Sequence, residues 1–91
     1  MKLDLSKHCI QTEIKRLYNR SVSRYFKLER DDPQLAGDIE LLKTGLETLD
    51  FRRLRSDYRE LAGGRDDRVV ELAAEDDGRV VVRIDGRDIA S

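Results

Sequence analysis

The sequence predicts an α+β fold: an antiparallel helical hairpin and a short third helix, followed by a C-terminal antiparallel β-hairpin. Hydrophobic residues recur at helical spacing through the first two thirds of the chain and alternate at strand spacing over residues 68–85. Junctions rich in Asp, Gly and Pro separate these segments. With 91 residues in total, we expect one small domain, residues 1–91.

The first predicted helix covers residues 5–29, which contain no Gly or Pro. Its hydrophobic residues lie mostly three or four positions apart, which is the spacing of one helix face. They are Ile10, Ile14, Leu17, Tyr18, Val22, Tyr25 and Leu28. Asp4 or Ser6 is a suitable N-cap. Because Leu3 and Leu5 alternate with polar residues, a short strand before the helix is the alternative.

The second predicted helix covers residues 33–49. Asp32 suits the N-cap and Pro33 the first helical position. Its hydrophobic residues alternate spacings of four and three, the pattern of a seam that packs along one long partner helix. The seam consists of Leu35, Ile39, Leu42, Leu46 and Leu49, which we assign to a helix-packing or dimer core.

A third helix is expected over residues 51–62, where Phe51, Leu54, Tyr58 and Leu61 form a separate hydrophobic set. On one continuous helix this set would lie roughly 120° from the preceding seam. Either the helix breaks near residues 48–50, with Asp50 as the new N-cap, or residues 33–62 form one helix that serves two surfaces. We favour the break, with Gly63 and Gly64 ending the third helix.

Residues 68–85 carry the strand signals. Val70 and Leu72 alternate with other residues before Asp76-Asp77-Gly78, and Val80, Val82 and Ile84 alternate after it. Asp85-Gly86 predicts a second turn, after which the tail adds a few paired residues or frays. Two strands alone are marginally stable in water. The hairpin must therefore pack on the helices, pair with residues 2–5, or pair with a second subunit.

Charge is balanced overall but arranged in blocks. The 18 basic and 19 acidic residues give a net charge of -1. Residues 1–30 carry a net +5, residues 31–50 a net -5, residues 51–65 a net +3 and residues 66–91 a net -4. Blocks of opposite sign are expected to attract each other in the folded chain. The competing interpretation is a basic face that binds nucleic acid.

Few residues are suited to catalysis or metal binding. His8 and Cys9 are the only residues of their types, and as neighbours on a helix they would point about 100° apart. A zinc site uses three or four such ligands. We therefore expect a surface His8, a small buried Cys9, and no catalytic site, metal or cofactor.

The composition also bears on location. The longest hydrophobic run, Val80 to Val82, is far shorter than the roughly 20 residues of a membrane span. A single cysteine excludes an intramolecular disulfide. These features are typical of a cytoplasmic protein that does not bind membranes, and the abundance of Arg and Asp is typical of a bacterial one.

Two functions remain open. A core this small in a chain with 41% charged residues favours a homodimeric protein-interaction domain, with an accessory or regulatory role and an unidentified protein partner. The alternative is a DNA-binding regulator. Three helices before a β-hairpin resemble a winged helix-turn-helix domain in topology, and Arg52, Arg55 and Arg59 would then contact nucleic acid from the third helix. The acidic hairpin opposes this alternative, because DNA would repel it.

Overall fold

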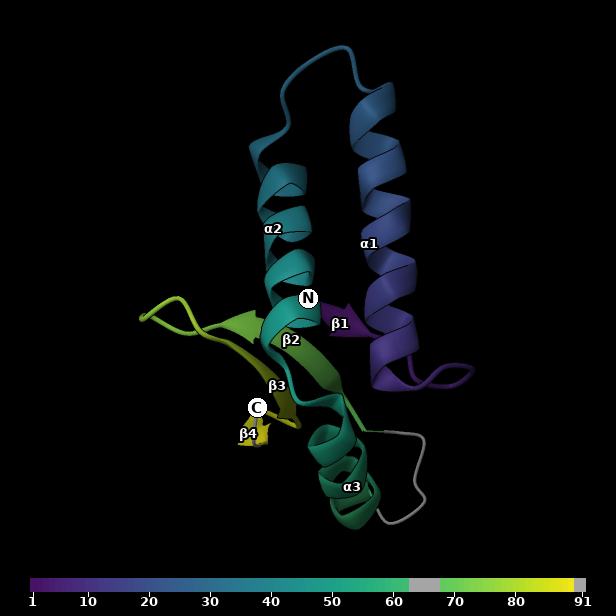
Figure 1. The fold of residues 1–91 in the computed structure, drawn as a ribbon, viewed down its shortest axis with the longest axis vertical. Helices are drawn as coiled ribbons and strands as arrows, with labels where there is room; N and C mark the ends of the chain where they lie inside the picture. The colour runs from purple at the N-terminus through teal and green to yellow at the C-terminus, as the bar shows by residue number, and fades with distance from the viewer. Residues whose placement is uncertain (63–67, 90–91) are drawn as a thin grey trace.

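The computed structural model describes residues 1–62 and 68–89 and confirms the α+β class (Figure 1). Two packed helices and a short third helix accompany a four-stranded antiparallel sheet of strand order β1-β2-β3-β4. The elements are β1 (Lys2–Leu3), α1 (Ile10–Lys27), α2 (Pro33–Thr48), α3 (Phe51–Ala62), β2 (Val70–Ala74), β3 (Val80–Ile84) and β4 (Arg87–Ile89).

The first predicted helix is too long at its N-terminal end. Residues 2–3 form β1, and α1 begins only at Ile10, with Cys9 rather than Asp4 or Ser6 at the N-cap. The cause is pairing with β2. The Met1 ammonium donates to the Leu72 carbonyl at 2.9 Å, and the Leu72 N–H donates to the Met1 carbonyl at 2.7 Å. The hairpin therefore pairs with the N-terminal segment, one of the three options that the sequence left open.

The break between the second and third helices is confirmed. The Asp32 carboxylate accepts the Leu35 N–H at 3.1 Å and caps α2, whose first residue is Pro33. Residues 49 and 50 separate α2 from α3, and the Asp50 carboxylate accepts the Arg53 N–H at 3.2 Å. Each cap satisfies a backbone donor that the first turn of a helix leaves unpaired. The predicted stop at Gly63 and Gly64 lies outside the described residues.

The β-hairpin is also confirmed. Leu72 pairs with Val82 at its centre, and Gly78 in the turn has a φ of 87°. The second turn joins β3 to β4, so the tail adds paired residues. Its two central residues, Asp85 and Gly86, have φ angles of 51° and 81°. Two consecutive positive φ angles define the hairpin turn that favours Asp-Gly.

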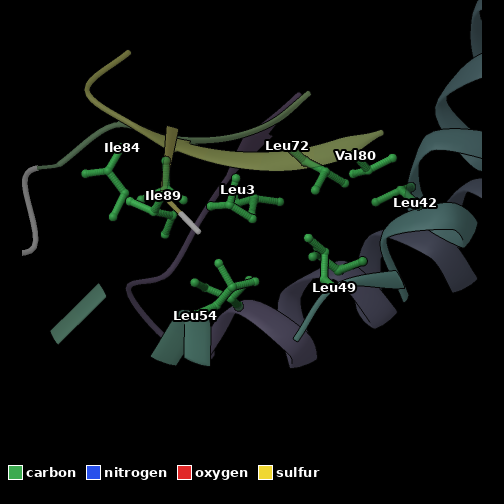
Figure 2. Close-up of a cluster of buried hydrophobic side chains, with 12 residues drawn as sticks. Leu3, Leu42, Leu49, Leu54, Leu72, Val80, Ile84 and Ile89 are labelled. Carbon is green, nitrogen blue, oxygen red and sulfur yellow. The ribbon is translucent and has the colours of Figure 1, made fainter. Parts of the chain in front are cut away.

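The core lies between the helices and one face of the sheet (Figure 2). Alternate strand residues such as Leu72 and Val82 point into it, and the edge strands contribute Leu3 and Ile89. The opposite face carries Val81, which is 5% exposed, and two ion pairs, in which Arg83 lies 2.7 Å from Asp88 and 3.4 Å from Glu75. All three helices contribute to the core cluster, through Ile10, Ile14, Leu42, Leu49 and Leu54.

The leucine seam of α2 is divided between two partners. Leu35, Leu42 and Leu49 are buried, while Ile39 and Leu46 are half-buried. Leu42 belongs to the same cluster as Leu72 and Val80 (Figure 2), so α2 packs on the sheet as well as on α1. The expectation that the seam packs along a single partner helix is therefore too simple.

Leu42→Ala is expected to lower the free energy of unfolding by about 2–4 kcal/mol, because the side chain is fully buried and its removal leaves a cavity. Leu46→Ala is the matched control and should cost less, since Leu46 is half-buried. Urea denaturation of the two variants measures both values. Equal losses would contradict this description of the seam.

Candidate functional site

The outer ends of α1 and α2 form an arm, defined here as residues 18–41, which stands clear of the sheet (Figure 1). Leu35 is the only buried residue in this range. Phe26 is 81% exposed, and its ring lies edge-on to that of Tyr25, with the centroids 6.4 Å apart. Val22 and Ile39 are half-buried. Tyr25 and Phe26 are therefore the large apolar side chains of the arm that remain exposed to water.

The arm is also charged on both helices. Arg20, Arg24 and Lys27 are exposed on α1, and Glu40 is exposed on α2. Within residues 1–62 and 68–89, no ion pair joins α1 to α2. The attraction expected between basic residues 1–30 and acidic residues 31–50 thus forms no ion pair between these two helices.

The third helix is anchored by its hydrophobic side. Leu54 is fully buried, and Phe51 and Tyr58 pack against the core cluster. The side chain of Leu61 lies outside the described residues. The opposite side of α3 exposes the three arginines that the sequence singled out, Arg52, Arg55 and Arg59.

Arg55 and Arg59 line a pocket of about 450 Å³ between α3 and residues 5–11. Arg52 is outside it. The lining residues are Leu5, His8, Cys9, Ile10, Gln11, Phe51, Arg55, Tyr58 and Arg59. Sequence reasoning missed this pocket because it placed residues 5–9 inside the first helix. The loop that they form instead brings His8 and Cys9 to α3.

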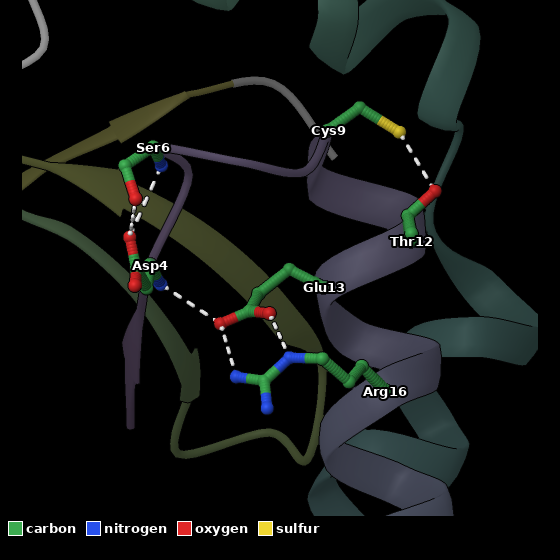
Figure 3. Close-up of polar contacts among 6 residues, drawn as sticks. All are labelled: Asp4, Ser6, Cys9, Thr12, Glu13 and Arg16. Carbon is green, nitrogen blue, oxygen red and sulfur yellow. Dashed lines mark hydrogen bonds and ion pairs between the residues drawn. The ribbon is translucent and has the colours of Figure 1, made fainter.

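Cys9 is exposed, so the expectation of a small buried cysteine is wrong. Its Sγ lies 3.1 Å from the Thr12 hydroxyl oxygen (Figure 3). Hydrogen bonding to Thr12 and the neighbouring Arg55 guanidinium lower the pKa of Cys9 to about 7. A lowered pKa increases the fraction of the thiolate, which is the form that alkylating agents attack.

A buried carboxylate fixes the loop that forms one wall of the pocket (Figure 3). Glu13 is 1% exposed and accepts hydrogen bonds from Arg16 at 2.7 and 3.1 Å. It also accepts the Asp4 N–H at 3.0 Å, which ties the start of the loop to α1. Asp4 in turn accepts the Ser6 N–H at 3.0 Å and closes a turn. The Arg16 guanidinium lowers the pKa of Glu13 below its ordinary value.

Glu13→Gln is expected to lower the free energy of unfolding at pH 7 by about 1 kcal/mol. This is a low value for hydrogen bonds between charged groups, because the Arg16 side chain is partly exposed to water. A lowered folded-state pKa gives stability that is complete above the ordinary value of 4.5 and is lost as the pH falls through the folded-state pKa. The deficit of the variant should therefore shrink as the pH falls below 4.5.

Urea denaturation at pH 7 and pH 3 measures this dependence. The exposed Glu47→Gln is the control and should match the wild type at both values. If Glu13→Gln lowers the free energy of unfolding equally at both pH values, the charge of the Glu13 carboxylate contributes nothing to stability.

Fold and surfaces together define a small α+β protein with a protruding helical arm. A protein-family model matches residues 1–83, and the chain belongs to that family. The matched range contains the arm and both walls of the pocket. No curated protein and no solved structure matches the chain.

The described residues contain no group of three or more His, Cys, Asp or Glu side chains placed to hold a metal ion. None of the helices in this part of the chain is long and apolar enough to cross a bilayer.

Proposed function

We propose that the protein is a homodimeric protein-interaction domain and that the arm supplies its dimer contact. The observation that carries this proposal is the 81% exposure of Phe26 beside a half-exposed Tyr25 at the outer end of the arm. Exposed aromatic rings at one site are typical of surfaces that bind another protein. Two arms packed together would form a four-helix bundle and cover these rings.

Charge complementarity supports a second copy as the occupant of this surface. The basic residues of α1 and the acidic Glu40 of α2 are exposed and form no ion pairs between the two helices within the described part of the chain. In an antiparallel pair of arms, α1 of one copy would face α2 of the other. The basic residues of each α1 would then lie near Glu40 of the other copy, and arrangements that bring like charges together would be disfavoured.

The sheet is a weaker choice for the dimer contact. An open hairpin edge was one reason to expect dimerisation, but β1 now pairs with one side of the hairpin and β4 with the other. The new edge strands have only two and three residues, and short edges offer little backbone for pairing with another chain. The arm is the larger unpaired surface.

We place this dimer in the cytoplasm, with an accessory or regulatory role. An exposed thiol with a pKa of about 7 and no second cysteine in the chain is suited to a reducing compartment. The dimer would also bind an unidentified protein partner. The helical arm and the sheet offer different surfaces for these two contacts.

The dimer is tested by light scattering after gel filtration. The wild type should have about twice the chain mass of 10.6 kDa at tens of micromolar. Phe26→Gln should move the population to the monomer, since it removes the most exposed apolar side chain of the arm. Val69→Thr is the matched control, because Val69 is 46% exposed near the sheet, and this variant should stay dimeric. A wild type that remains monomeric up to millimolar concentration contradicts the proposal.

Nucleic-acid binding through α3 is the second candidate function. The observation that favours it is the exposure of Arg52, Arg55 and Arg59 on a helix anchored by Leu54. Arginines on a helix that packs on the core from its other side are the arrangement of a recognition helix. Arg55 and Arg59 also line the pocket, whereas Arg52 is exposed and does not line it.

Duplex binding at several salt concentrations tests this candidate. Replacing Arg52, Arg55 and Arg59 with Ala should abolish binding and flatten its salt dependence by about 0.9 log unit per lost phosphate contact. The control replaces the exposed Arg20, Arg24 and Lys27 of the arm with Ala and should bind normally. A wild type that does not bind at low salt, or loss only in the control, excludes α3 as the contact.

A further inference from the structure

We propose that the pocket between residues 5–11 and α3 binds a small amphiphilic anion, an apolar chain or ring that ends in a carboxylate or a phosphate ester. The elements that line this pocket, residues 5–11 and α3, lie at the opposite end of the molecule from the outer end of the arm (Figure 1). The proposal does not rest on dimerisation, and it concerns a ligand rather than a protein partner.

The size and walls of the pocket suit a small organic molecule. Its volume of about 450 Å³ lies within the range of ordinary ligand sites, about 300–1,000 Å³. Leu5 and Ile10 line one wall, and Phe51 lines the other. Leu5 and Phe51 are half-buried and pack against the core, so both walls are fixed by the fold. An apolar chain placed there would be removed from water on two sides.

The charge of the pocket selects an anion. Arg55 and Arg59 are four residues apart on one face of α3, so their guanidinium groups belong to the same lining. Among the described residues, no carboxylate forms an ion pair with either arginine, and none lines the pocket. A guanidinium group binds carboxylates and phosphates through two parallel hydrogen bonds. The two arginines therefore define the end of the pocket that receives the charged head group.

Cys9 supplies a built-in reporter for this ligand. Cys9 lines the same pocket, and the Arg55 guanidinium contributes to the lowered pKa of its thiol. An anion bound to Arg55 would compete with the thiolate for that guanidinium and would cover the sulfur. Occupancy of the pocket is therefore expected to slow alkylation of Cys9, a readout that is independent of any activity.

The first experiment is an amide NMR titration with four probes of equal chain length. Octanoate and octyl phosphate carry the anion, octanol is neutral and octylammonium is cationic. We expect saturable shifts at Cys9, Arg55 and Arg59 with at least one anion and none with the other two probes. The tighter anion identifies the head group. Equal shifts with octanol or octylammonium, or no saturation with either anion at millimolar concentration, would overturn the proposal.

The second experiment separates the pocket arginines from their neighbours. Arg55→Gln combined with Arg59→Gln should lower the affinity for the anion by at least about tenfold. The control, Arg52→Gln combined with Arg53→Gln, removes the same charge from exposed positions of α3 outside the pocket and should bind normally. The anion should also slow iodoacetamide alkylation of Cys9 in the wild type and in the control. Equal weakening in both double variants, or no protection of Cys9, would exclude this pocket.

Discussion

The pairing of the N-terminal residues with β2 is the contact on which the rest of the structure depends. It joins positions 71 residues apart, with Met1 and Leu72 exchanging two backbone hydrogen bonds. It covers an open edge of the hairpin and places Leu3 in the core. The chain must then return to α1 through residues 4–9, where the buried Glu13 holds it. The loop that results is one wall of the pocket, so the pocket is a consequence of this pairing.

The same anchoring explains the arm. Only Ile10 and Ile14 of α1 are buried in the core cluster, and Leu42 and Leu49 hold the other end of α2. Half-buried residues of both helices also pack against this cluster, namely Leu17, Tyr18, Leu41 and Leu46. Beyond them the arm is supported by the two helices alone. The molecule therefore presents two different surfaces at opposite ends, an apolar and charged arm and a pocket lined by arginines. A larger core would have covered one or both.

Local signals predicted most of this fold from the sequence. Asp32 and Asp50 act as caps because the hydrogen bond of a cap stays within a few residues, and Asp85-Gly86 forms its turn for a similar reason. The alternation of Leu3 and Leu5 with polar residues offered β1 as an alternative to helix, but so few residues could not decide between the two, because the partner strand lies far along the chain. Arg55 was predicted as an exposed contact residue, but its nearness to Cys9 depends on tertiary packing that periodicity does not contain.

The central claim is that a second copy covers the arm, and intermolecular distances test it most directly. In a mixture of isotope-labelled and unlabelled chains, nuclear Overhauser effects filtered for contacts between copies should connect the Phe26 ring with the Ile39 methyl groups. These contacts should be absent for Val81, on the face of the sheet that points away from the core. Nuclear Overhauser effects between copies that involve residues of the sheet, with none from the Phe26 ring, would contradict the account.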